Sequence, residues 1–208
     1  MQRIDVEHVS ISRGNIKMGN IPSVSLPPVV SCNPKACKFC AKKCYARKIS
    51  KLRPSVKQSY ERNLKILLEE PKKYWREVNA QVALTTYFRF HVAGDIYDIF
   101  YLMNMVEVAR NNPHCQILCF TKQYSSVNTY LQMHKCFPEN LHIIFSIWRG
   151  LDCENTFNLP EAHVFYKDGF TTASDGAKYC SGNCTECAIE GKNCWTLLEG
   201  EQVIFKEH

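Results

Sequence analysis

The chain has 208 residues, of which 45% are hydrophobic, and its formal net charge is +6 at pH 7. This length and composition can bury one full hydrophobic core, which argues against a small scaffold held together mainly by disulfides. No apolar run approaches the ~20 residues of a membrane-spanning helix, and Met1–Asp5 is not followed by the apolar core of a signal peptide. The sequence therefore predicts a cytoplasmic protein without a membrane span.

Residues 1–31 are rich in glycine and proline and predict an irregular arm, with one strand in the apolar stretch Val24–Val30. From Pro54 onward, apolar residues recur at helical spacing in two stretches that Glu69–Pro71 separates. The following elements alternate in type. Strands are predicted at 86–92, 116–121, 141–146 and 164–166, and helices at 99–109 and 126–133.

Strand–helix alternation of this kind predicts a parallel sheet with right-handed crossovers, and hence one α/β domain. We place this domain at residues 1–166. Residues 167–208 are interpreted as a C-terminal cysteine-rich extension, in which Val203–Phe205 adds an edge strand.

Eight of the twelve cysteines form two compact groups. The first group consists of Cys32, Cys37, Cys40 and Cys44, and the second of Cys180, Cys184, Cys187 and Cys194. Each group supplies four thiolates from one short segment, which is what a single metal ion or iron–sulfur cluster needs. An even number of cysteines also fits disulfides, but Cys-x2-Cys spacing in a chain without a signal peptide favours metal or redox chemistry.

Spacing bears on the choice between zinc and iron. Zinc sites usually join two separated Cys-x2–4-Cys pairs, whereas the cysteines here follow one another at short intervals. Such runs favour [4Fe–4S] ligation, with one or two clusters per chain, and zinc stays an alternative. Trp195 is predicted to pack over the second group and exclude water. His91, on a strand, is predicted to be a core histidine with satisfied hydrogen bonds.

A basic stretch overlaps the first group. Nine basic residues and no acidic ones lie between Cys32 and Tyr60. They can offset the negative charge of a thiolate-bound cluster, or they can bind the phosphates of a nucleic acid. The overlap favours the first interpretation. Since no base-reading motif is recognisable, residues 35–57 predict only weak, sequence-independent nucleic-acid binding.

The ends of the predicted strands carry polar groups, and the carboxyl ends of parallel strands form one rim. The first cysteine group follows the first strand, Gly94 and Asp95 the second, Thr121 and Lys122 the third, and Ser146 the fourth. Gly94 and Asp95 are the candidates for binding a cofactor amine or hydroxyl. The alternative is that Asp95 caps the next helix, and Lys122 is expected to be solvated.

A cysteine loop after the first strand, then a helix and a strand that ends in a Gly-acid pair, resembles the partial (β/α) barrel of radical S-adenosylmethionine enzymes. Cys37-Lys38-Phe39-Cys40 is similar to the second half of their C-x3-C-x-aromatic-C loop. Cys32 lies one residue too far away, and Cys44 adds a fourth thiolate. The resemblance implies a shortened radical-SAM barrel whose first cluster binds S-adenosylmethionine.

Several separate runs resemble the phage gene-product-88 family: ISRGNIKMGNIPSVSLPP, CAKKCYARK, RFHVAGDIYD, ILCFTK and CWTLLEGEQVIFKEH. Proteins of that family look like shortened radical-SAM barrels with extra cysteines and are carried by bacteriophages and their hosts. The resemblance implies an iron–sulfur protein in the bacterial host cytoplasm, with an unidentified redox partner. By this resemblance we expect either an enzyme or a non-catalytic protein, namely a ferredoxin-like electron carrier or a structural iron–sulfur protein, with the second group as an auxiliary cluster.

Overall fold

The computed structural model describes residues 7–207, so the predicted lack of a signal peptide, which rests on Met1–Asp5, lies outside the described residues. The elements follow in the order β1 (Ile11–Ser12), β2 (Ser23–Val24), α1 (Pro34–Cys40), the 3-10 helix η1 (Ala41–Lys43), α2 (Tyr45–Leu52), α3 (Pro54–Glu69), α4 (Pro71–Val82), β3 (Tyr87–Phe90), α5 (Ile99–Asn111), β4 (Gln116–Thr121), α6 (Tyr124–His134), β5 (Leu141–Ser146), β6 (Glu161–Phe165), β7 (Lys178–Tyr179), α7 (Cys184–Ile189), the 3-10 helix η2 (Asn193–Trp195) and β8 (Gln202–Lys206).

The strands form one eight-stranded sheet in the order β1-β2-β3-β4-β5-β6-β8-β7. Only β1 is antiparallel to its neighbour, and all other pairs are parallel. The predicted α/β class is therefore confirmed. Over residues 7–207 the sheet is open, with β1 and β7 at its edges, and no closed barrel forms.

Some predicted strands and helices have the expected bounds and others do not, and the local sequence explains the difference. Both β4 and β5 have the predicted bounds, and Pro54 and Pro71 begin α3 and α4, where proline needs no hydrogen-bonded N–H. The strand predicted at Val24–Val30 shrinks to β2, because Pro27 and the proline after it cannot donate to a ladder. The edge strand predicted near the C-terminus is wrong in its position, because β8 is internal and β7 lies outside it.

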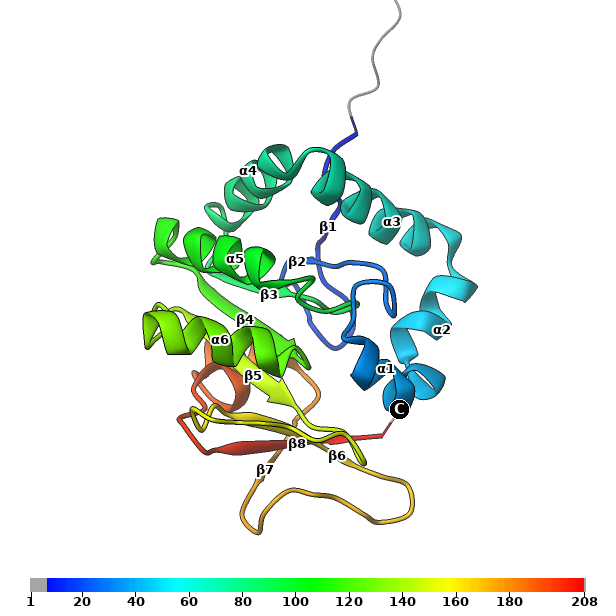
Figure 1. Ribbon diagram of the computed structural model, residues 1–208, viewed down its shortest axis with the longest axis vertical. Helices are drawn as coiled ribbons and strands as arrows, with labels where there is room; N and C mark the ends of the chain where they lie inside the picture. Colours follow the sequence, from blue (N-terminus) through cyan, green and yellow to red (C-terminus); the bar gives the residue numbers. More distant parts are fainter. Residues whose placement is uncertain (1–6, 208) are drawn as a thin grey trace, which may run out of the picture.

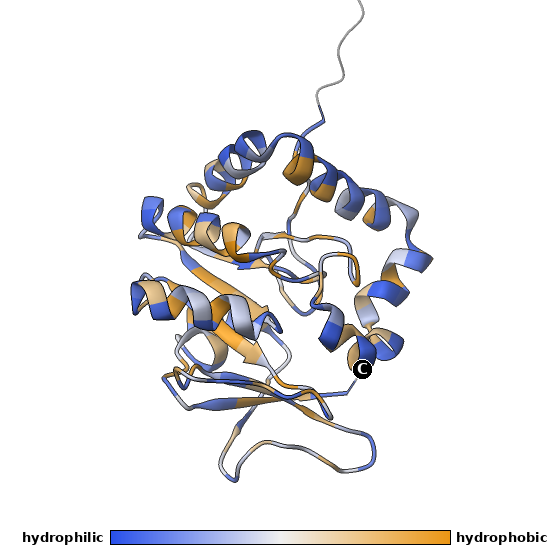
Figure 2. Cartoon of the chain, viewed as in Figure 1, coloured by the Kyte–Doolittle hydropathy of each residue, from blue (hydrophilic) through white to orange (hydrophobic). Residues whose placement is uncertain are grey.

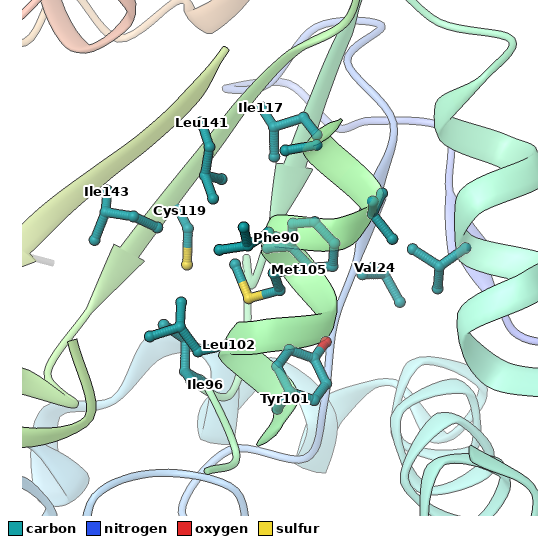
Figure 3. Packing of buried hydrophobic residues seen from close by; sticks show 14 of the residues in the cluster. Val24, Phe90, Ile96, Tyr101, Leu102, Met105, Ile117, Cys119, Leu141 and Ile143 are labelled. Carbon is teal, nitrogen blue, oxygen red and sulfur yellow. The ribbon is translucent and has the colours of Figure 1, made fainter. Parts of the chain in front are cut away.

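Helices α3 to α6 cover one face of the sheet and bury the larger part of the core (Figure 1). Their outer sides are largely hydrophilic (Figure 2). In β4, Ile117 and Cys119 turn towards Leu102 and Met105 of α5 (Figure 3), whereas Leu118 belongs to a second core on the opposite face. Strands buried on both faces explain why the predicted strands are almost continuously apolar. Each such large side chain contributes about 1.5–3 kcal/mol when fully buried.

The second face is covered by the N-terminal arm together with α7 and η2. Thr185 of α7 donates from Oγ1 to the Met18 carbonyl at 2.9 Å and accepts from the Asn20 amide at 3.3 Å. Gly19 has φ +60°, and a Cβ there would lie 2.0 Å from Thr185 Oγ1. The arm therefore touches α7 too closely for any other residue at position 19.

The C-terminal extension contributes to the same sheet as the rest of the chain. Its strands β7 and β8 are hydrogen-bonded to one another, and β8 pairs with β6. The division between residues 166 and 167 stays a prediction. Within residues 7–207, no helix is both long and apolar enough to cross a membrane.

Candidate functional site

The polar groups predicted to share a rim are hydrogen-bonded to one another. Asp95, just after β3, is buried and accepts through Oδ1 from Thr121 Oγ1 at 2.6 Å and from the Ile96 amide at 2.8 Å. Its Oδ2 accepts from the Lys122 amide at 2.9 Å. Lys122 Nζ donates in turn to Ser146 Oγ at 2.9 Å. The shared rim is thus confirmed, and the expectation that Lys122 is solvated is wrong.

Asp95 joins the rim loops and does not cap a helix. The N-cap of α5 is Asp98, whose side chain accepts from the Tyr101 amide at 2.7 Å. Burial raises the pKa of Asp95, and the donors on Thr121 and Lys122 oppose this rise by stabilising the carboxylate. Both oxygens of Asp95 already accept hydrogen bonds from the protein. A role for this carboxylate in binding a cofactor amine stays a prediction.

Gly94 allows the loop before the first cysteine group to approach β3 closely. Its φ is +79°, and a Cβ at this position would lie 2.5 Å from Ser31 Oγ and 2.6 Å from the Leu26 carbonyl oxygen. The Asp95 amide donates to the same Ser31 Oγ at 3.3 Å. A side chain at Gly94 would therefore push away the segment that leads to Cys32.

The first cysteine group is distributed over α1 and the ends of its neighbours. Asn33 caps α1 by accepting from the Lys35 amide at 2.9 Å, while its Nδ2 donates to the Lys122 carbonyl at 3.0 Å. The Val29 amide donates to Cys32 Sγ at 3.3 Å. Val29 has φ +73°, which is a strained conformation for a β-branched residue. The site is therefore anchored to the rim and contains local backbone strain.

The first-group thiols influence one another and the rim charges. Burial raises the pKa of Cys32 to about 12, with the Asp95 carboxylate as the next cause. Burial also raises the pKa of Cys37 and of Cys40, while the Lys122 ammonium opposes both rises. These thiols are protonated at neutral pH, so a bound metal would have to displace their protons.

The second cysteine group lines one apolar pocket on the sheet face. The pocket is lined by the four cysteines together with Arg89, Leu118, Phe120, Asn183, Asn193, Trp195 and Phe205. Cys187 is buried, and its Sγ accepts from Asn193 Nδ2 at 3.2 Å and lies 3.1 Å from Ser181 Oγ. Trp195 is buried against the pocket and donates from Nε1 to the Cys184 carbonyl at 3.3 Å. The predicted packing of Trp195 over this group is confirmed.

Arg89 is a functional candidate that the sequence analysis missed. It lies on β3 between two phenylalanines that face the helices, so the alternation of the strand turns it into the cysteine pocket. Burial raises the pKa of Cys194 to about 12 and also raises that of Cys184, and the Arg89 guanidinium opposes both rises. The sequence did contain a signal for it, because an arginine is unusual within an apolar strand that is buried on both faces.

Tyr45 links the surroundings of the two groups. It follows Cys44 at the start of α2, and its hydroxyl donates to the Val92 carbonyl. Burial raises the pKa of this hydroxyl, Arg89 opposes the rise, and both Cys44 and Cys184 add to it. Tyr45 is therefore within electrostatic reach of a cysteine from each group.

The sulfur atoms are near each other but not yet arranged as a binding site. Over residues 7–207, no three side chains of cysteine, histidine, aspartate or glutamate are placed to hold one metal ion. None of the twelve cysteines forms a disulfide in the structure, although both groups fall within the described range. The eight proposed ligands therefore stay a prediction.

His91 agrees with its prediction only in part. It is buried beside Phe90 and Tyr101, but neither ring nitrogen has a hydrogen-bond partner in the described part of the chain. Burial lowers its pKa to about 3, and the neighbouring Ala93 backbone opposes this. His91 is a neutral core residue whose ring has a backbone contact at Ala93 but, within residues 7–207, no hydrogen bond of regular geometry.

The structure is that of an α/β protein with an open, mostly parallel sheet. It has two candidate thiolate centres, one on the rim of the sheet and one on its second face. The chain belongs to the Gene product 88 family, which it matches over residues 7–187. It is similar to the Gene 88 protein of Mycobacterium phage L5, with 29% identity over 147 residues. That alignment covers 64% of this chain and 59% of the relative, so the chain spans less than two thirds of the relative's length. No solved structure matches the chain.

Proposed function

We propose that this protein is an iron–sulfur protein that binds a [4Fe–4S] cluster at each cysteine group. The observation that carries the proposal is the pocket of the second group, where four cysteines and a guanidinium face one apolar space. A thiolate-bound cluster supplies one-electron chemistry, at a potential set by nearby charge, hydrogen bonds to sulfur and burial. This chain provides all three influences at the second group.

The donor set of the second group fits such a cluster in its chemistry. Its ligands are thiols, Asn193 supplies an N–H···S contact, and Trp195 and Phe205 restrict access by water. The four sulfurs have to draw together during loading, since no three of them are yet placed around one ion. Their protons are released in the process, which makes loading more favourable at higher pH.

Metal analysis with matched variants tests the proposal. Anaerobically purified protein should contain about eight iron and eight sulfide ions per chain, about four of each from every [4Fe–4S] cluster. Cys40→Ser and Cys187→Ser should each remove about half of both. Cys136→Ser is the control, because Cys136 is exposed and belongs to neither group. Stoichiometric zinc without sulfide would reject the proposal.

A finer proposal is that the sheet is a shortened radical-SAM barrel. Two observations support it: the strands from β2 to β6 are adjacent in sequence order, and the first cysteine group lies on the rim beside Gly94 and Asp95. S-adenosylmethionine binding needs one iron that no cysteine occupies. Adding S-adenosylmethionine should then change the electron paramagnetic resonance spectrum of the reduced first cluster. An unchanged spectrum with four cysteine ligands supports an electron carrier.

A second candidate function is sequence-independent nucleic-acid binding through residues 35–57. All nine basic side chains in this range are exposed, and only Lys43 and Lys57 form salt bridges, to Glu207 and Glu61. Phosphate contacts alone give binding that weakens steeply with salt and does not distinguish sequences. Fluorescence anisotropy with two unrelated oligonucleotides at several salt concentrations tests this. Equal affinity that falls as salt rises supports the candidate, and no binding at low salt rejects it.

A further inference from the structure

The guanidinium of Arg89 is placed among thiols without an acidic partner. Its Nε is buried and has no hydrogen-bond partner, and its Nη1 approaches only the weakly accepting Met18 Sδ, at 3.2 Å. No carboxylate between residues 7 and 207 forms a salt bridge with it. The guanidinium carbon lies 4.8 Å from the centroid of the Phe120 ring. An aromatic face therefore holds this cation in place, but no anion neutralises it.

A second cation has a similar position. Lys17, from the N-terminal arm, lies with Nζ 4.6 Å from the centroid of the Phe205 ring, and its charge acts on the Cys184 thiol. The rings of Phe120 and Phe205 meet edge to face at 5.6 Å, so the two cations sit on adjoining aromatic side chains. The acidic residues nearest in sequence to the second cysteine group are not partners of these cations. Glu186 is exposed, and Glu190 forms a salt bridge with Lys192. One cation thus lines the pocket that contains the four thiols, and a second lies over one of its aromatic lining residues.

Removing a cation from water without a partner is unfavourable, and structures usually pair such a group. We propose that Arg89 is the positioned counter-cation of the second cysteine site, where it neutralises a thiolate-bound anionic cluster. Lys17 assists it from the arm. This inference rests on the proposed function and adds to it the residue that sets the charge of the second site. Arg89 acts through electrostatics and is not itself a ligand.

The charge balance gives the direction of its effect. Reduction adds one negative charge to a cluster, so a nearby cation favours the reduced state and raises the reduction potential. Removing the charge of Arg89 should therefore lower the potential of the second cluster. Arg89→Lys, which keeps the charge but not the planar guanidinium, should retain most of the effect.

Potentiometric titration monitored by electron paramagnetic resonance tests this in the full chain, with Cys40→Ser present so that only the second cluster reports. Arg89→Gln should lower the reduced-to-oxidised ratio at a fixed solution potential by about tenfold, equivalent to about 59 mV for one electron. Arg110→Gln is the matched control, because Arg110 lies in an exposed pair with Glu107. An Arg89→Gln potential equal to that of the control would overturn the inference.

Stability measurements distinguish a counter-cation from a packing residue. Arg89→Met keeps an apolar side chain against Phe120 and removes the charge. In metal-free protein the free energy of unfolding should rise, since a partly buried cation without a partner is lost. In cluster-loaded protein, iron should be released to a chelator several times faster. A lower stability of the metal-free variant would mean that Arg89 serves packing, and the inference would fail.

The two proposals fail in different ways. Zinc without sulfide in the wild-type protein rejects the iron–sulfur function, yet faster zinc release from Arg89→Met would still support a counter-cation. Iron and sulfide at full content, with Arg89→Gln and Arg89→Met behaving like wild type, supports the iron–sulfur function and rejects the role of Arg89.

Discussion

The two cysteine groups offer the same kind of side chain in different surroundings. The first lies at the carboxyl rim of the sheet, near the Asp95 carboxylate and the Lys122 ammonium. The second lies on the face of the sheet opposite α3 to α6, near the cations of Arg89 and Lys17. Two groups of four cysteines therefore need not have the same properties, because the charge and burial around them come from the strands beneath.

The two sites also depend on different parts of the chain. The first is held by loops that meet at the ends of β3 and β4, through the contacts of Gly94 with Ser31 and of Asn33 with Lys122. The second is held by a long-range contact between the N-terminal arm and α7. Perturbing one set of supports should damage one site and spare the other, which gives two ways to test the comparison, and acid gives a third test that acts between the two sites.

The largest effect is expected from Gly94→Ala. The added Cβ would meet Ser31 Oγ at 2.5 Å, on a backbone with positive φ. Backbone strain and overpacking together should lower the free energy of unfolding by about 4 kcal/mol. The first site should lose its iron while the second retains it, as measured by denaturant titration and metal analysis.

Gly169→Ala is the control for Gly94→Ala, since Gly169 has φ +83° but nothing within 4 Å of an added Cβ. It should show only the backbone strain, about 1 kcal/mol. Equal losses in the two variants would show that the close approach at Gly94 does not hold the first site.

Lowering the pH should reduce the free energy of unfolding through His91, which lies between the two sites and two residues after Arg89 on the same segment. Its pKa is lowered from 6.5 to about 3 by burial, so between these values the unfolded chain binds a proton that the folded chain excludes. This contribution is complete above pH 6.5 and is lost as the pH falls through that window. The metal-free protein should lose about 3 kcal/mol between pH 6.5 and 4, at about 1.4 kcal/mol per pH unit.

His91→Asn isolates that contribution, because asparagine tolerates the positive φ of 61° and does not titrate. Its unfolding free energy should depend less steeply on pH than that of the wild type over the same range. Parallel pH curves for the two proteins would show that His91 is not the acid-sensitive group.

The smallest effect is expected from Thr185→Val in α7. The substitution removes the hydroxyl that bonds to the Met18 carbonyl and to the Asn20 amide, and should cost about 1.5 kcal/mol. Iron should be lost faster from the second site alone. Thr185→Ser, which keeps the hydroxyl, should behave like wild type, and faster loss from the first site would contradict the comparison.

Much of the fold was predictable because its signals are local. Continuous apolar runs marked β4 and β5, and prolines marked the starts of α3 and α4. The rim was predictable as well, since parallel strands bring their carboxyl ends together. The helices within the cysteine groups were missed, because α1 and α7 are short and owe their starts to asparagine caps at Asn33 and Asn183.

The surroundings of the second site were not predictable from spacing. Arg89 lines the pocket because of strand alternation, and Lys17 lies over the lining residue Phe205 because the arm crosses the second sheet face. The hydrogen bond from Lys122 to Ser146 depends on β4 and β5 being neighbours. Each of these contacts joins segments far apart in sequence, whose proximity is a property of the tertiary structure.

The contact between the arm and α7 has a consequence for biosynthesis. Met18 and Thr185 are separated by 167 positions, so the two halves of this support leave the ribosome far apart in time. At 5–20 residues per second, the delay is on the order of ten seconds. During that interval the arm cannot form its contact with α7, whereas β2 to β5 have already been synthesised and can form the rim. The segments around the first cysteine group can therefore meet on the nascent chain before Thr185 is made, whereas the support of the second group cannot form until then.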